Sequence, residues 1–156
     1  MEQIKVKAMA ILKACPEDVY ATIADYRQGH PQIIPQENLY DLQVEQGGYG
    51  AGTVIRFKAR VLGVERSFYQ RVGEPEPGKV LVEQDIDSIH HVVTTFTVTP
   101  LEQGQQSHVE ISHIENASPG LQGFIERVVV PIVLSPVLRK ELRLLEAVAQ
   151  RRGIPR

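Results

Sequence analysis

Apolar and polar residues alternate along most of the chain, and the period of this pattern changes three times. Residues 3–14 alternate loosely with a period of two, which predicts a strand. A helix is expected from Pro16, because proline favours the first helical position and the acidic Glu17 and Asp18 suit the first turn. The next segment, GHPQIIPQEN, contains two prolines, so it has room for only a short helix.

From residue 39 onwards the period of two returns and predicts a series of strands. Their expected ranges are 39–46, 52–62, 64–72, 79–86, 90–98 and 107–115. Short polar or glycine-containing turns separate them, as is typical of an antiparallel sheet whose strands follow one another directly. Together with the first strand, this gives a sheet of six or seven strands.

The last segment of the chain has a helical period from about residue 119 to residue 152. Ser118 suits the N-cap and Pro119 the first helical position, and a helix of this span is roughly 50 Å long. The apolar stretch VVVPIVLSPVL contains Pro131 and Pro136, each of which removes a backbone hydrogen bond. We therefore expect a kink or short break between residues 130 and 136, with this segment as a lid over one end of a cavity.

The length of 156 residues and the even pattern indicate a single domain covering residues 1–156. A net charge of −2 gives no electrostatic reason to expect nucleic acid as a partner. The single cysteine, Cys15, excludes an internal disulfide and is consistent with a cytoplasmic protein. No window reaches the ~20 consecutive apolar residues of a transmembrane helix, so no transmembrane segment is expected.

Catalytic and metal-binding motifs are not evident in the sequence. Cys15 precedes a helix start, but no neighbouring residue supplies the base that a nucleophilic thiol needs. The adjacent His90 and His91 point to opposite faces of a strand, as do His108 and His113, which disfavours a shared zinc ion. Phosphate-binding and dinucleotide-binding glycine motifs are missing, so we expect no metal and no cofactor.

Three stretches carry a resemblance to a known family: ILKACPEDVYATIADYRQGHPQIIP near the start, V-x-E-P-x-P-x-K-V-L-V at 72–82, and F-T-V-T-P at 96–100. In their order and spacing the chain resembles the START-like superfamily, also called SRPBCC or the polyketide cyclase and lipid-transport superfamily, to which the birch pollen allergen belongs. The resemblance implies an α+β helix-grip fold. In that fold a curved antiparallel sheet wraps around a long C-terminal helix, two short helices lie between strands 1 and 2, and a cavity separates sheet and helix.

The period of two predicts which strand residues face this cavity, although one β-bulge would invert a set. The predicted cavity residues on the strands are Ile55, Phe57, Arg66, Phe68, Gln70, Gln84, His90, Thr94, Phe96 and His113. The resemblance adds Tyr26 and His30 at the cavity mouth. On the inner face of the C-terminal helix we expect Phe124, Val128 and Ile132 to touch a ligand.

Three functions are compatible with these features. Binding or transport of a hydrophobic small molecule, such as a lipid, a quinone or a polyketide-like compound, is favoured because no catalytic set is evident. The alternative is an aromatase/cyclase or dehydratase acting on a polyketide-like substrate, for which Arg66, Gln70, His90 and His113 would have to serve in proton transfer. A second alternative is regulation of a partner protein through the outer surface, where the uncharged residues 128–138 would also serve as a homodimer contact.

Overall fold

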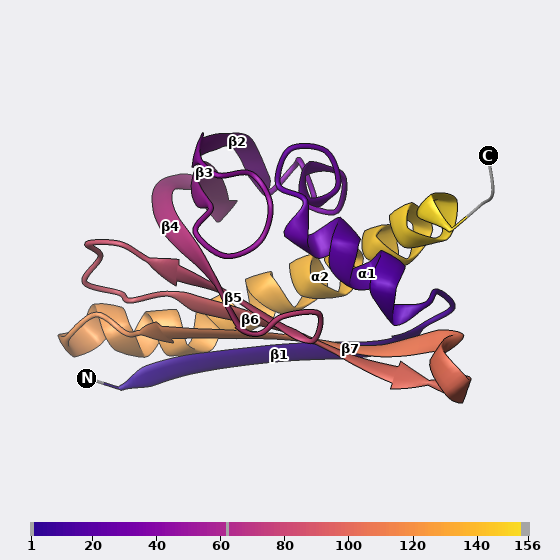
Figure 1. Ribbon diagram of the computed structural model, residues 1–156. Coiled ribbons are helices and arrows are strands. Elements are labelled where there is room, and N and C mark those ends of the chain that lie inside the picture. The colour runs from indigo at the N-terminus through magenta and orange to yellow at the C-terminus, as the bar shows by residue number, and fades with distance from the viewer. Residues whose placement is uncertain (1, 62, 154–156) are drawn as a thin grey trace.

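The computed structural model describes residues 2–61 and 63–153 of the chain (Figure 1). Its elements are β1 (Gln3–Leu12), α1 (Pro16–Ala24), the 3-10 turn η1 (His30–Gln32), β2 (Leu39–Gln46), β3 (Val54–Val61), β4 (Val64–Glu76), β5 (Val80–Asp85), β6 (Val93–Leu101), the 3-10 turn η2 (Glu102–Gly104), β7 (Gln106–Asn116) and α2 (Gly120–Arg152). The predicted succession of strand, two short helical segments, strands and one long helix is confirmed.

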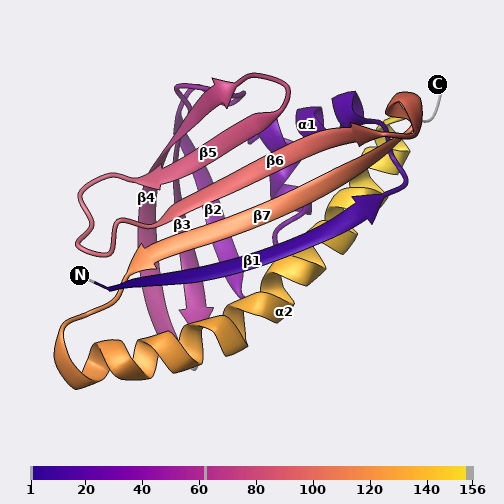
Figure 2. The ribbon, with the colours of Figure 1, turned by 90° about the horizontal axis from the view of Figure 1, so that it is seen from below.

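All seven strands belong to one antiparallel sheet in the order β1-β7-β6-β5-β4-β3-β2. Because β1 and β2 lie at opposite edges, α1 and η1 carry the chain from one edge of the sheet to the other. Figure 2 shows the strands fanned out, with α2 running alongside β1. The α+β helix-grip architecture expected from the sequence is therefore confirmed.

Helix α2 is continuous from Gly120 to Arg152, so the predicted break between residues 130 and 136 is wrong. Both prolines are accommodated inside the helix, and Figure 2 shows the helix curving along its length. Proline removes one hydrogen bond and crowds the preceding turn, but it bends a helix more often than it ends one when the flanking turns are held. Pro136 is exposed and Pro131 half-buried, so neither ring displaces tightly packed neighbours.

The two halves of α2 differ in how they pack. Before Val137 its only buried residue is Gly123, whereas the C-terminal half buries Val137, Leu138, Glu141, Leu142, Leu145, Val148 and Ala149. Of these, Leu138, Leu142, Leu145, Val148 and Ala149 join the main core with α1 and the inner faces of β1 and β7. The first half of the helix is thus separated from the sheet by the space that forms the cavity.

By length and composition alone, α2 is long and apolar enough to cross a bilayer, with a mean hydropathy of 1.6 over 18 residues. The expectation that no window approaches such a length was therefore too strict. The core helices of soluble proteins pass the same test, so it does not place the helix in a membrane. Of this window 17% is buried, so most of the apolar stretch is open to the cavity or to the outside.

Candidate functional site

A cavity of about 480 Å³ lies between the concave face of the sheet and α2. Most of its wall is apolar and comes from three sources: β3 and β4, residues 34–42, and one face of α2. Apart from Asn38 and Arg60, the polar residues of the wall belong to two groups. One group is partly open to solvent, and the other is buried under α1 and the C-terminal half of α2.

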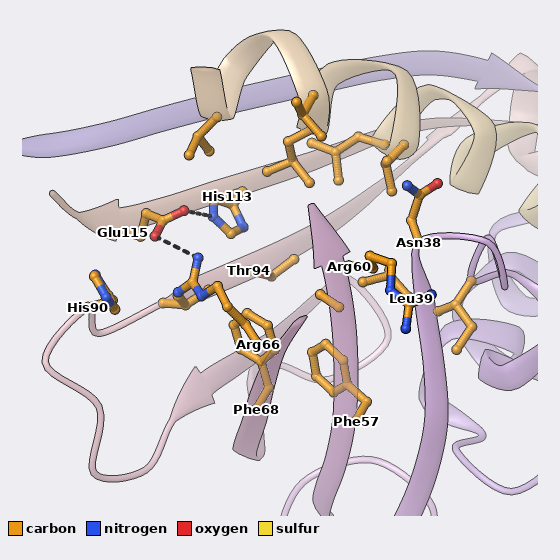
Figure 3. Close-up of a pocket in the computed structure, with 18 of the residues that line it drawn as sticks. Asn38, Leu39, Phe57, Arg60, Arg66, Phe68, His90, Thr94, His113 and Glu115 are labelled. Carbon is orange, nitrogen blue, oxygen red and sulfur yellow. Dashed lines mark hydrogen bonds and ion pairs between the residues drawn. The ribbon is translucent and has the colours of Figure 1, made fainter. Parts of the chain in front are cut away.

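The open end is built around the carboxylate of Glu115 on β7 (Figure 3). His113 Nε2 lies 3.0 Å from Glu115 Oε1, and Arg66 Nη1 lies 3.4 Å from Oε2. Burial works against ionisation of Glu115, but the hydrogen bond from His113 and the charges of His113, Arg66 and His90 outweigh it, so the pKa of Glu115 is lowered. The open end therefore contains an ionised carboxylate with cationic and hydrogen-bonding partners.

Arg66 retains hydrogen-bonding capacity toward the cavity. A guanidinium group has five N–H donors. Among the described residues, Arg66 uses one nitrogen for its contact with Glu115. Its guanidinium also lies 5.0 Å from the centre of the Phe68 ring, which stacks on Phe57 with ring centres 4.8 Å apart. In Figure 3 this pair of rings lies next to Arg66, so an apolar surface and a free donor set adjoin each other.

The closed end is built around Glu83 on β5. The hydroxyl of Tyr26 donates a hydrogen bond of 2.6 Å to Glu83 Oε2, and His30 Nε2 lies 3.4 Å from the same oxygen. His30 stacks on Tyr26 with ring centres 4.3 Å apart. Burial and the charge of Glu83 raise the pKa of Tyr26 well above its usual value, so its hydroxyl remains a donor.

The orientation of His30 restricts where its protons are. Its Nδ1 lies 2.7 Å from the carbonyl oxygen of Ile23, so this nitrogen must carry a proton. The contact of Nε2 with Glu83 is attractive only if a further proton resides on one of these two atoms. The imidazole of His30 is therefore held between the Ile23 carbonyl and the Glu83 carboxylate at the wall of the cavity.

Glu141 of α2 adds a second carboxyl group to the closed end. It is 5% exposed, lines the cavity, and makes no hydrogen bond to any other residue of the described chain. Burial, and then repulsion from Glu83, raise the pKa of Glu141 well above its usual value. The cavity wall therefore holds one carboxyl group that favours the protonated form, Glu141, and two with a lowered pKa that favour ionisation, Glu115 and Glu126.

The register of the sheet explains how the two ends are connected. Glu83 pairs with Thr94, and Thr94 pairs with His113, so these residues form a row across β5, β6 and β7. Neighbouring strands are about 4.8 Å apart, so the row extends roughly 10 Å. All three side chains line the cavity, and they provide a polar track between the buried end and the open end.

Of the fifteen residues predicted to line the cavity, nine do so: His30, Ile55, Phe57, Arg66, Phe68, Gln70, His90, Thr94 and His113. His30 is only 3% exposed and belongs to the closed end, so its expected position at the mouth is wrong. His90 lies in the loop before β6 and not on the strand. Whether these residues contact a ligand stays a prediction.

The other six predicted residues lie away from the cavity wall. Tyr26 and Phe96 are buried behind His30, against which Phe96 packs edge-on. Gln84 is exposed, because β5 turns Leu81 and Glu83 inward. The helix residues Phe124, Val128 and Ile132 are 56%, 52% and 68% exposed, since α2 turns its other face to the cavity.

Four acidic residues of the cavity wall were missed: Glu83, Glu115, Glu126 and Glu141. Glu115 could have been predicted from the sequence, because it continues the series of inward-facing residues Val109, Ile111 and His113 on the same strand. Glu141 lies three residues after Leu138 in the apolar stripe of the helix, where a charged residue is unusual.

Cysteine and metal chemistry find no support in the described chain. Cys15 Sγ lies 3.0 Å from Asp18 Oδ2, and this hydrogen bond and then burial raise the pKa of the thiol, which disfavours a nucleophilic thiolate. Within residues 2–61 and 63–153, no three His, Cys, Asp or Glu side chains are arranged to hold a metal ion.

Comparison with known proteins first defines the class. Solved structures with the same fold include the KanY protein, with a TM-score of 0.81 and 27% identity over 96% of this chain and 99% of that chain. The ZhuI aromatase/cyclase from Streptomyces sp. R1128 has a TM-score of 0.79 and 17% identity over 98% and 97%. A START superfamily protein from Mycobacterium smegmatis has a TM-score of 0.73 and 14% identity over 96% and 99%.

The sequence also matches a family profile almost throughout. Residues 3–150 match the family described as polyketide cyclase / dehydrase and lipid transport, so the chain belongs to this family. The resemblance to the START-like superfamily is thereby confirmed. No curated protein matches the sequence. Because one fold of this kind serves several functions, the particular function has to be argued from the cavity.

Proposed function

We propose that this protein binds a hydrophobic small molecule in the cavity between the sheet and α2. The observation that carries the proposal is the cavity itself, whose volume of about 480 Å³ falls within the range of small-molecule sites. Its wall is mainly apolar, and its few polar groups occupy defined positions at the two ends. The family to which the chain belongs includes lipid-transport proteins, which agrees with such a role.

The chemistry of the wall defines the kind of ligand. Phe57, Phe68 and the aliphatic side chains of α2 provide surface for a flat or branched apolar body. At the open end, the unused donors of Arg66 suit an oxygen atom or a carboxylate. A lipid, a quinone or a polyketide-like compound has this combination of an apolar body and oxygen-bearing groups.

Native mass spectrometry of gently purified protein tests the proposal, followed by displacement of the fluorescent probe N-phenyl-1-naphthylamine. We expect the probe to bind, and at least one of a fatty acid, a quinone, a sterol or an aromatic polyketide to displace it. A protein that emerges empty and binds none of these compounds would contradict the proposal.

A matched pair of variants on α2 locates the binding. Leu134 lines the cavity, so Leu134→Trp fills part of it and should weaken probe binding at least about fivefold. Leu121 lies on the same helix but is 75% exposed, so Leu121→Trp should bind the probe as the wild type does. Equal effects of the two substitutions would place the probe elsewhere.

The second candidate function is an aromatase/cyclase or dehydratase on a polyketide-like substrate. It is favoured by the opposite protonation preferences of Glu141 and Glu115 within one cavity, because acid–base catalysis needs a proton donor and a proton acceptor. Similar solved structures include the ZhuI aromatase/cyclase and the di-domain ARO/CYC BexL, the latter with a TM-score of 0.69 and 16% identity.

Incubation with a poly-β-ketone thioester separates the two candidates. Formation of an aromatic product, followed by absorbance and mass spectrometry, would establish the enzyme. Binding of the thioester without any product would leave the binding protein as the function. A polyketide synthase gene next to the gene for this chain would favour the enzyme.

A further inference from the structure

Glu141 is the polar group of the closed end whose hydrogen bonding is incomplete. Glu83 has two partners there, the Tyr26 hydroxyl and His30 Nε2. Glu141 lines the same end and is 95% shielded from solvent, yet it has no hydrogen-bond partner among the residues described. Its carboxyl oxygens are open to the cavity and not sealed inside the core, so they can bond to a group that enters the cavity.

The surroundings of Glu141 keep its proton in place. Burial disfavours the ionised form, and Glu83 is the charged neighbour that raises its pKa further. The facing groups of Tyr26, His30 and Glu83 are already bonded to one another. Glu83 therefore has its own partners, whereas no side chain of the described chain accepts a hydrogen bond from Glu141.

A second unfilled group adjoins this end. Gln70 is 1% exposed and lines the cavity, and its Nε2 donates a hydrogen bond of 2.9 Å to Asp85 Oδ1. Its Oε1 has no hydrogen-bond partner in the described chain. Gln70 is the diagonal neighbour of Glu83 across β4 and β5, because Gln70 pairs with Asp85 and Val72 pairs with Glu83.

We propose that the carboxyl group of Glu141 donates a hydrogen bond to an uncharged oxygen of the ligand, a carbonyl or a hydroxyl, at the closed end of the cavity. This inference rests on the proposed binding function and adds a constraint on the ligand. The end of the molecule that enters the cavity first carries an oxygen, and purely hydrocarbon ends are disfavoured. A hydroxyl can act both as an acceptor and as a donor at this site. It accepts a hydrogen bond from Glu141 and can donate its own proton to a neighbouring acceptor.

The test uses three naphthalene compounds of similar shape in the displacement assay at pH 7, with the full chain. They are 2-acetylnaphthalene, 2-ethylnaphthalene and 1-(2-naphthyl)ethylamine. The measured quantity is the affinity for the ketone divided by the affinity for the hydrocarbon. The two compounds differ in solubility, but this difference is the same for every variant, so it cancels when the ratios of two variants are compared. We expect Glu141→Leu to lower this ratio roughly fivefold, as is typical for one lost hydrogen bond.

Two further variants make the result specific. Glu141→Gln keeps an N–H donor at this position and should restore the ratio. Arg143→Leu changes an exposed charge on the same helix and should leave the ratio as in the wild type. The inference is overturned if Glu141→Leu leaves the ratio unchanged. It is also overturned if the wild type prefers the amine to the ketone and Glu141→Gln abolishes that preference. If the wild type binds neither these three compounds nor any of the probe, fatty acid, quinone, sterol or polyketide tested above, the proposed binding function itself fails.

Discussion

Replacing Glu141 with glutamine tests whether its carboxyl group is protonated in the folded protein. Glutamine has nearly the same shape but does not ionise. In the unfolded chain the pKa of the carboxyl group has its ordinary value of 4.5, whereas burial and Glu83 raise it in the folded state. A group with a raised pKa contributes its full stability below the unfolded pKa, and this contribution is lost as the pH rises toward the folded pKa.

The magnitude follows from this linkage. Between pH 4.5 and the raised folded pKa, unfolding releases the proton of Glu141, so each pH unit lowers the free energy of unfolding of the wild type by about 1.4 kcal/mol relative to Glu141→Gln. For a domain of this size, 1 kcal/mol corresponds to about 2–4 °C in Tm. The Tm of the variant should therefore rise relative to that of the wild type by roughly 3–6 °C per pH unit.

Differential scanning calorimetry of both proteins at pH 5, 6, 7 and 8 measures this difference in Tm. Groups that titrate in the same way in both proteins cancel in the difference. Glu17→Gln is the control, because Glu17 is exposed on α1 and its replacement should give a constant difference. Parallel curves for Glu141→Gln and the wild type would refute the reasoning, because they would mean that Glu141 is ionised in the folded protein.

Three further predictions concern other parts of the molecule. Glu115→Gln should be less stable than the wild type by about 1–2 kcal/mol at pH 7, and the gap should shrink as the pH falls below 4.5 toward the lowered folded pKa of Glu115; a gap independent of pH in thermal scans would contradict this. Tyr26→Phe should cost about 1–3 kcal/mol in urea unfolding by removing a buried donor, while the exposed Tyr49→Phe should cost less than about 0.5 kcal/mol; equal losses would count against it. If residues 128–138 pair two copies, light scattering after size exclusion should show a dimer that Ile132→Glu dissociates, and a wild type that stays monomeric at high concentration excludes it.

The sequence was sufficient for the architecture because the main signals are local and repeated. Pro16 begins α1 as expected, and the alternation in β1 and β7 matches the residues that are buried. In β5 the alternation failed, because Val80, Leu81 and Val82 make both faces equally apolar. Only the pairing with β4 and β6 decides which face turns inward.

The site was predicted less well, since its contacts join residues far apart in the chain. Glu83 meets Tyr26 and His30 across more than fifty positions, and no local pattern encodes that distance. The sequence did not determine which face of α2 turns toward the sheet, because residues 128–138 are apolar on every side of the helix. The helix break was predicted from proline alone, whereas the flanking turns keep the helix continuous.

The uneven burial of α2 has a consequence for how a ligand exchanges with solvent. Local opening requires little free energy where few side chains are buried, and residues 120–136 contain a single buried residue, Gly123. The half that follows is anchored in the core, and Pro131 and Pro136 remove two backbone hydrogen bonds close to the boundary. Separation of the first half from the sheet would open the cavity while the core stays folded. The rate of ligand exchange would then depend on this local equilibrium and not on the global stability of the domain.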